Sequence, residues 1–128
     1  MPKILIVEDE EKLTGYLKSL LENRGHSVVT AVSGKEALDS YISHNPDAVL
    51  LDLYLPGDVN GYDVLSCIKS KAPGVKVAVI TGYSESSVRE RANSLGADIF
   101  FKKPFMPHEL FDALEQILNK AGGGTNNE

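Results

Sequence analysis

The apolar run Ala48-Val49-Leu50-Leu51 restricts the fold of this chain more than any other segment. Pro46 stands before it and Pro56-Gly57 after it, so turn signals bound the segment on both sides. An unbroken apolar run of this kind indicates a strand that is buried on both faces, as in a parallel sheet covered by helices. Asp52 ends the predicted strand, and ligand sites in such sheets lie at the carboxyl ends of the strands.

Strand-like and helix-like segments alternate five times along the chain. The predicted strands are residues 3–7, 28–32, 47–52, 75–80 and 99–101. The spacing of apolar residues predicts helices over 11–24, from 33 onward, between 61 and 73, over 84–95 and from 107 onward. Ser33-Gly34-Lys35-Glu36 has the pattern of a capping box, and the helix that it opens is expected to bury Ala37 and Ile42.

This (βα)₅ alternation with short connections predicts an α/β fold in which helices cover both faces of a five-stranded parallel sheet. Right-handed crossovers allow the doubly wound, flavodoxin-like strand order 2-1-3-4-5, although alternation alone does not select it. The chain of 128 residues fits one domain over residues 1–120. Residues 121–128 are polar and glycine-rich, which is typical of a flexible tail or the start of a linker.

Charged residues follow three of the predicted strands. Glu8 and Asp9 follow the first strand, Asp52 ends the third, and Lys102-Lys103 follow the fifth. In a parallel sheet these groups converge on one edge, where the carboxylates repel one another and raise at least one pKa. A hard cation such as Mg²⁺ relieves that repulsion because it prefers oxygen ligands. One lysine remains to pair with an anion such as a phosphate group.

Four segments together resemble the receiver domain of the two-component response-regulator family. The matching segments are residues 4–10, 49–57, 79–82 and 96–105, in the family's order, and the resemblance covers residues 3 to about 120. It implies the strand order 2-1-3-4-5 and a signalling role: a phosphoacceptor that catalyses its own phosphotransfer and dephosphorylation rather than an enzyme. The implied phosphoryl donor is a phosphohistidine on a sensor histidine kinase or phosphotransfer protein.

The resemblance also implies roles for individual residues. Asp52 accepts the phosphoryl group. Mg²⁺ is bound directly by Asp9 and Asp52, by Glu8 either directly or through water, and by the main-chain carbonyl of Tyr54. The Thr81 hydroxyl donates a hydrogen bond to a phosphoryl oxygen.

Two positions on the fifth strand complete the implied site. Lys103 stands directly before Pro104 and pairs with the phosphoryl group, whereas Lys102 points to the opposite side of the strand. The Lys103–Pro104 bond is a candidate for the cis form. Phe100 matches the family's switch aromatic, which turns inward when Thr81 moves.

Two further features surround the expected site. The resemblance implies that the positions of Tyr54 and Tyr83 line the path of the hydrolytic water, so their rings are expected to prolong the life of the aspartyl phosphate. The loop of residues 56–61 is one residue longer than usual, which surface loops tolerate easily. Because it borders the expected phosphorylation site, it could alter which kinase docks.

Net charge, cysteine content and the length of apolar stretches exclude several classes of partner and site. A net charge of −5 argues against a nucleic-acid-binding surface, and Cys67 is the single cysteine, so an intramolecular disulfide or cysteine metal site is excluded. No apolar stretch approaches the roughly 20 residues of a membrane span, and we expect a cytoplasmic protein. The expected partners are the kinase and an output partner or domain, with the chain a monomer or a phosphorylation-dependent dimer.

Three alternatives remain for comparison. A degenerate receiver would bind partners without phosphorylation, which the presence of Asp9, Asp52, Thr81 and Lys103 disfavours. A haloacid-dehalogenase-like phosphohydrolase, a Mg²⁺-dependent enzyme, needs a second aspartate two positions after its nucleophile, where this chain has Tyr54. A flavodoxin-type flavin carrier must hold a phosphate in its first loop, where the acidic residues that follow the first strand would repel it.

Overall fold

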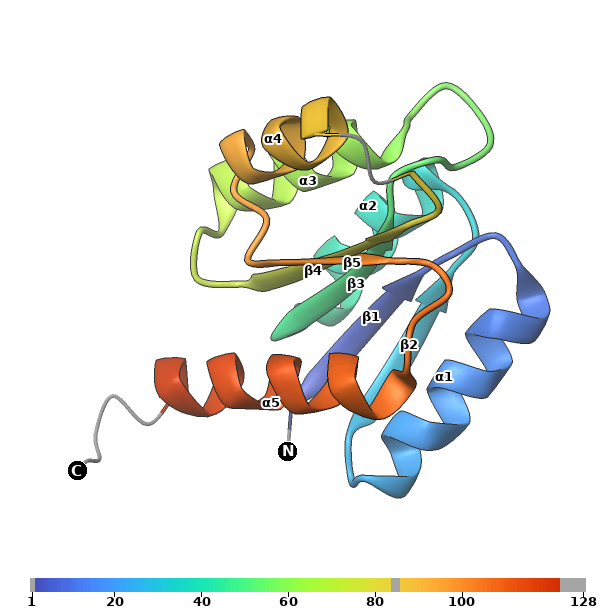
Figure 1. The fold of residues 1–128 in the computed structure, drawn as a ribbon, viewed down its shortest axis with the longest axis vertical. Coiled ribbons are helices and arrows are strands. Elements are labelled where there is room, and N and C mark those ends of the chain that lie inside the picture. Colours follow the sequence, from blue (N-terminus) through green and yellow to red (C-terminus); the bar gives the residue numbers. More distant parts are fainter. Residues whose placement is uncertain (1, 84–85, 123–128) are drawn as a thin grey trace.

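A five-stranded parallel sheet forms the centre of the protein (Figure 1). The structure, a computed structural model, describes residues 2–83 and 86–122. The strands are β1 (Lys3–Val7), β2 (Ser27–Ala31), β3 (Ala48–Asp52), β4 (Lys76–Thr81) and β5 (Ile99–Lys102). Their order is β2-β1-β3-β4-β5, and every neighbouring pair is parallel. The predicted fold class and strand order are confirmed.

Helices cover both faces of this sheet. They are α1 (Glu11–Asn23), α2 (Gly34–His44), α3 (Gly61–Lys71), α4 (Ser86–Ser94) and α5 (Pro107–Gly122). Helices α1 and α5 pack on one face, and α2, α3 and α4 pack on the other (Figure 1). Helix α5 runs to Gly122, and the rest of the tail expected from the sequence, residues 123–128, lies outside the described residues.

The side chains of the central strands pack alternately into two hydrophobic cores, one on each face of the sheet. In β1, Ile4 and Ile6 belong to the core under α1 and α5, whereas Leu5 and Val7 belong to the core under α2 to α4. Strand β3 alternates in the same way, and all five of its residues are buried. This two-sided burial is why its sequence is an unbroken apolar run rather than an alternating one.

Local signals set the helix ends, with three departures from expectation along α2 and α3. The Ser33 hydroxyl caps α2 by accepting from the Glu36 amide, but the Glu36 carboxylate accepts from Val32 N–H rather than completing a capping box. Asn60 and Asp63 form a complete capping box at α3, which the sequence analysis did not predict. Ile42 is 70% exposed, contrary to expectation. It lies five residues after the buried Ala37, so the helical turn carries it to a different side of α2.

Gly61 lets α3 start directly against β3. A Cβ at this position would overlap the Leu53 Cα and the Asp52 carbonyl oxygen. The close approach brings the first turn of α3 against the residues that follow Asp52, which anchors the end of the strand. No helix in the described part of the chain is long and apolar enough to cross a membrane.

Candidate functional site

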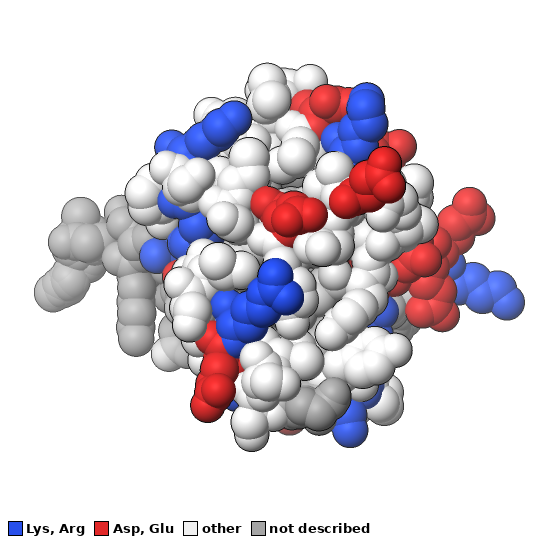
Figure 2. All heavy atoms as spheres, turned by 90° about the horizontal axis from the view of Figure 1, so that it is seen from above, with Lys and Arg blue, Asp and Glu red and all other residues white. Residues whose placement is uncertain are grey.

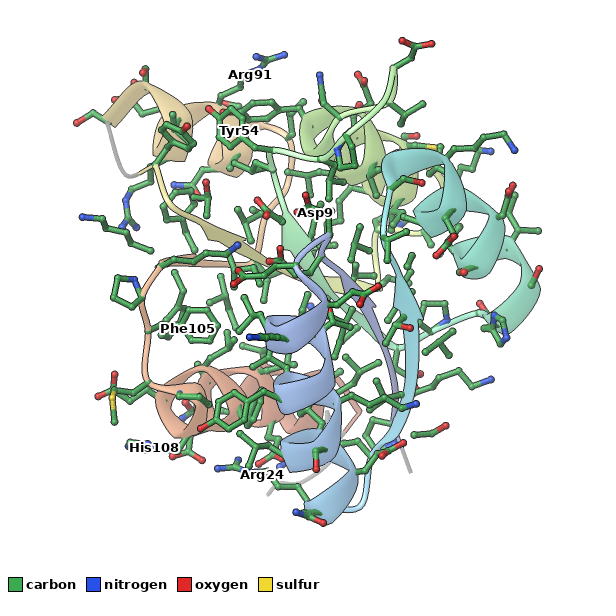
Figure 3. The ribbon with its side chains drawn as sticks, turned by 90° about the vertical axis from the view of Figure 1, so that its right-hand side faces the viewer. Asp9, Arg24, Tyr54, Arg91, Phe105 and His108 are labelled. Carbon is green, nitrogen blue, oxygen red and sulfur yellow. The ribbon has the colours of Figure 1, made fainter. Side chains whose placement is uncertain are left out.

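Three carboxylates meet at the carboxyl edge of the sheet. Glu8 and Asp9 follow β1, and Asp52 is the last residue of the neighbouring strand β3. One carboxylate oxygen from each of them lies within 4.8 Å of the other two. Glu8 and Asp52 are only 1% and 5% exposed, whereas Asp9 is exposed at the start of α1 (Figure 3). The structure therefore brings together the three carboxylates that were predicted to hold a metal.

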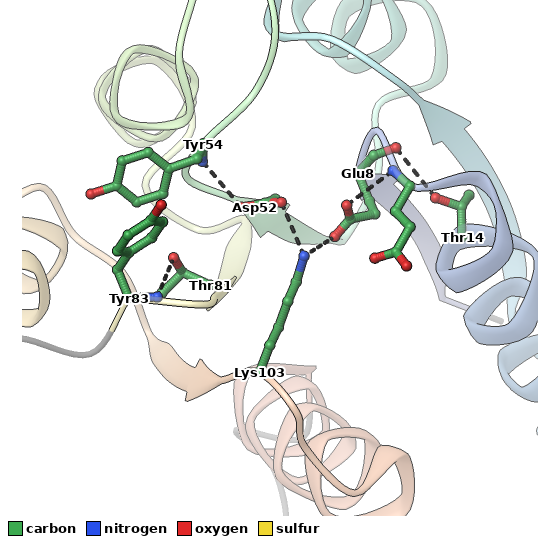
Figure 4. Close-up of polar contacts among 8 residues, drawn as sticks. Glu8, Thr14, Asp52, Tyr54, Thr81, Tyr83 and Lys103 are labelled. Atoms are coloured by element: carbon green, nitrogen blue, oxygen red, sulfur yellow. Dashed lines mark hydrogen bonds and ion pairs between the residues drawn. The ribbon is translucent and has the colours of Figure 1, made fainter.

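Lys103 reaches this cluster from the segment after β5. Its Nζ donates to Glu8 Oε1 at 2.7 Å and to Asp52 Oδ2 at 3.1 Å (Figure 4). The Lys103 amide donates to the Thr81 carbonyl at 2.7 Å, and the Lys103–Pro104 peptide is cis. Lys102 is exposed, and Lys103 is the lysine of this pair that contacts the carboxylates.

The pKa values of Glu8 and Lys103 reflect this crowding. Burial raises the pKa of Glu8 above its ordinary value, the hydrogen bond from Lys103 opposes that rise, and the charge of Asp52 adds to it. Burial alone would lower the pKa of Lys103, but the hydrogen bond to Glu8 and the charge of Asp52 outweigh it and raise that pKa. Lys103 therefore stays protonated, because the neighbouring carboxylates of Glu8 and Asp52 stabilise its positive charge.

Main-chain groups orient the two buried carboxylates. Glu8 Oε2 accepts from the Glu10 amide at 3.1 Å, and the Glu8 carbonyl accepts from the Thr14 hydroxyl at 3.3 Å. Asp52 Oδ1 accepts from the Tyr54 amide at 3.0 Å, so its other oxygen faces Lys103. These bonds preorganise both carboxylates with oxygens that a hard cation such as Mg²⁺ prefers, and the donor set could hold a metal ion.

Thr81 and the tyrosines lie on the other side of Asp52. Thr81 is fully buried at the end of β4, next to β3, and its Oγ1 accepts from the Tyr83 amide at 3.2 Å. The rings of Tyr54 and Tyr83 are in contact, with centroids 4.4 Å apart and planes tilted by 52°. Figure 4 shows this pair on the side of Asp52 opposite Glu8. The two tyrosines predicted to flank the site thus also contact each other.

Phe100 carries a contact that the sequence analysis missed. The residue is half-buried in β5, and the Arg89 guanidinium carbon lies 4.5 Å from its ring centroid. A second arginine of α4, Arg91, lies 4.0 Å from the ring of Tyr62. The only sequence signal for such contacts is the presence of arginines on a helix with few apolar residues.

The histidines lie away from the acidic cluster. His26 contacts Glu115 on α5 at 2.6 Å, and Glu115 also pairs with Arg24 at 2.9 Å. Arg24 lies beyond the C-terminal end of α1, whereas Asp9 lies at its N-terminal end (Figure 3). No sequence pattern indicates this group of contacts, in which Arg24 after α1 and His26 before β2 meet Glu115 of α5 at the opposite edge of the sheet.

The fold and this edge define a parallel α/β domain with a carboxylate cluster that a lysine bridges. A sequence model of the response regulator receiver domain matches residues 4–115. The response regulator SaeR of Staphylococcus aureus (strain USA300) is 34% identical over 120 residues, which are 94% of this chain and 52% of that protein. The chain spans about half the length of the curated relatives it matches.

Solved structures of receiver domains superpose closely on this chain. A CheY-like receiver domain protein from Methanospirillum hungatei superposes with a TM-score of 0.90 at 28% identity, over 95% of this chain and 97% of that one. The non-phosphorylated HemR receiver domain from Leptospira biflexa gives a TM-score of 0.85 at 36% identity, over 92% and 94%. This chain belongs to the response regulator receiver domain family and is a signalling domain of two-component systems.

Proposed function

We propose that Asp52 accepts a phosphoryl group from the phosphohistidine of a sensor histidine kinase or phosphotransfer protein. Mg²⁺ would be held by Glu8, Asp9, Asp52 and the Tyr54 carbonyl. The observation that carries the proposal is the Lys103 ammonium, which bridges Asp52 and Glu8. A lysine held against the acceptor carboxylate is placed to pair with the incoming phosphoryl oxygens.

The proposed step needs positioning and positive charge rather than a further protein nucleophile. The phosphorus–nitrogen bond of the phosphohistidine breaks as a phosphorus–oxygen bond to Asp52 forms, and the imidazole leaves. The Tyr54 amide fixes one Asp52 oxygen, which leaves the other to attack. Lys103 and the Thr81 hydroxyl stabilise the charge on the transferring oxygens. A bound Mg²⁺ would supply further neutralisation of this charge.

A groove beside the site supports docking of the phosphoryl donor. It has a volume of about 670 Å³ and is lined by Lys12, Leu13, Tyr16, Lys103, Pro104 and Phe105, among others. Phe105 lies beside α1 in Figure 3, and Tyr16 at the groove is 55% exposed. The groove combines apolar walls with Lys103, so it fits a helix that presents apolar side chains around its phosphohistidine. With such a donor, we propose a cytoplasmic location for the protein.

Phosphorylation is proposed to act through Thr81 and Phe100. These side chains lie on the same face of the sheet, because β4 pairs Val79 with Phe100 and Thr81 is two residues beyond Val79. When Thr81 moves toward a phosphoryl group on Asp52, it vacates space into which Phe100 turns. The surface formed by α4, β5 and α5 then changes and binds an output partner or domain differently.

The experiment is labelling with acetyl phosphate as a small-molecule donor, read by intact mass. We expect one phosphoryl group per chain with Mg²⁺, and none with EDTA or in Asp52→Asn. Asp58→Asn is the matched control, because Asp58 is an exposed aspartate of the neighbouring loop. Its labelling should equal that of the wild type. Full labelling of the Asp52→Asn variant would show that the acceptor is another residue.

A further inference from the structure

Helix α4 is attached to the domain with few apolar contacts. Its buried residues are Val88 and Ala92, and polar side chains fill most of its other positions. Arg89 and Arg91 add contacts to aromatic rings on two different elements, Phe100 in β5 and Tyr62 in α3. Figure 2 shows that positive and negative side chains are intermingled on the face seen from above Figure 1. Arg89 and Arg91 thus contact aromatic rings in addition to adding positive charge to this surface.

The contact of Arg89 differs from that of Arg91 in what it touches. Tyr62 is 8% exposed and packs within the core between α3 and the sheet. Phe100 is half-buried on the edge strand, where one side of its ring is available to the guanidinium. An arginine over an aromatic face is attracted by the ring quadrupole, and the attraction ends when the ring moves away.

We propose that Arg89 is a positioning residue of the switch, which holds the Phe100 ring in the half-buried position that it has in this structure and thereby favours the unphosphorylated form. The proposal rests on the proposed function, because it takes Phe100 as the aromatic that responds to Thr81. When the ring turns toward Thr81, its contact with Arg89 breaks and the guanidinium is released to the surface of α4. Arg89 thereby biases the resting equilibrium toward the inactive form.

The size of the bias follows from the contact. An exposed arginine–aromatic contact changes a two-state equilibrium by about two- to fivefold. If the active form is a minor population, removal of the contact raises that population by the same factor. The apparent affinity for a ligand that binds the active form then rises equally, because it scales with the fraction that is competent to bind.

The test is a titration with beryllofluoride and Mg²⁺, a mimic of the phosphoryl group, on the whole chain. Arg89→Ala should bind beryllofluoride about two- to fivefold more tightly than the wild type, and Arg89→Lys should lie closer to the wild type because it retains a cation. Arg91→Ala is the matched control: it removes the same kind of contact from the same helix, and its affinity should stay at the wild-type value.

The ring resonances of Phe100 provide a second readout. Without ligand, Arg89→Ala should shift them toward their positions in the beryllofluoride-bound wild type, and Arg91→Ala should leave them in place. Wild-type affinity and ring shifts in Arg89→Ala would overturn the proposal, and so would an equal effect of Arg91→Ala, which would indicate general loosening of α4. If Asp52→Asn binds beryllofluoride as well as the wild type, the proposed function itself fails, whatever Arg89 does.

Discussion

The change Asp9→Asn is expected to raise the stability of the metal-free protein and to weaken the stabilisation that Mg²⁺ provides. In the metal-free protein Asp9 adds a negative charge to Glu8 and Asp52, with the three oxygens within 4.8 Å of one another. Its removal should stabilise the fold, because it relieves repulsion between carboxylates. With Mg²⁺ present, the same removal takes away a proposed ligand, so the variant should gain less stability from the metal than the wild type gains.

The magnitude can be worked from the distances. Two unit charges 4.8 Å apart interact with about 3 kcal/mol at an effective dielectric constant of about 20. Exposure of Asp9 screens this repulsion, Lys103 offsets part of it, and loss of the carboxylate near the start of α1 costs about 0.3–1 kcal/mol. We expect a net gain of about 1 kcal/mol in EDTA. Mg²⁺ at about a hundredfold excess over its Kd should stabilise the wild type by about 2.7 kcal/mol.

The assay is urea unfolding of both proteins in EDTA and in saturating Mg²⁺. Glu11→Gln is the control, because Glu11 is an acidic residue in the first turn of the same helix that does not belong to the three-carboxylate cluster. It should show the full Mg²⁺ stabilisation and no gain in EDTA. Destabilisation of Asp9→Asn in EDTA, or an undiminished response to Mg²⁺, would refute the electrostatic account of this site.

Three further predictions concern other parts of the molecule. Gly61→Ala should destabilise the fold by about 3 kcal/mol in chemical denaturation, because the added Cβ would overlap backbone atoms. Gly15→Ala is the control: this position is inside α1 with open space around it, so the change should stabilise the fold by about 0.5–1 kcal/mol. Tyr54→Asn and Tyr83→Ala should each speed decay of the phosphorylated protein, about tenfold for every 1.36 kcal/mol of barrier removed, and unchanged decay would show that the rings do not shield the phosphate. Glu115→Gln should lower the free energy of unfolding by about 1–2 kcal/mol, because it weakens the contacts of Glu115 with Arg24 and His26; full wild-type stability would contradict this.

The fold could be predicted from sequence because its signals are local. Each strand is an apolar run and each helix a periodic one, and the (βα)₅ alternation follows from them. The site could be predicted for a related reason: parallel strands place their carboxyl ends at one edge, so charged residues after β1, β3 and β5 must meet there. The strand order itself came from the family resemblance.

Contacts between long side chains on distant elements left no such local signal. Lys69 of α3 donates to the Pro73 and Val75 carbonyls and to Asp98 before β5, which joins segments far apart in the sequence. Arg89 and Phe100 are eleven residues apart, and nothing in the helix pattern indicates which ring the guanidinium covers. Such contacts depend on rotamers and on packing between elements, which periodicity does not encode.

The strand order explains why this site needs a lysine from the segment after β5. The chain leaves β1 toward β2 on one side of the sheet and leaves β3 toward β4 on the other side. Because the two connections diverge, a crevice opens between the carboxyl ends of β1 and β3. Glu8 and Asp52 come from the two strands that border this crevice, so the chain concentrates negative charge there. Strand β5 is two positions away from β3, and only a long side chain such as Lys103 spans that distance. The Lys103 side chain is flexible and enters the crevice from outside, so its ammonium can move from Glu8 to a phosphoryl group on Asp52. The carboxylates of Glu8 and Asp52 meanwhile stay in place, because main-chain amides donate hydrogen bonds to them.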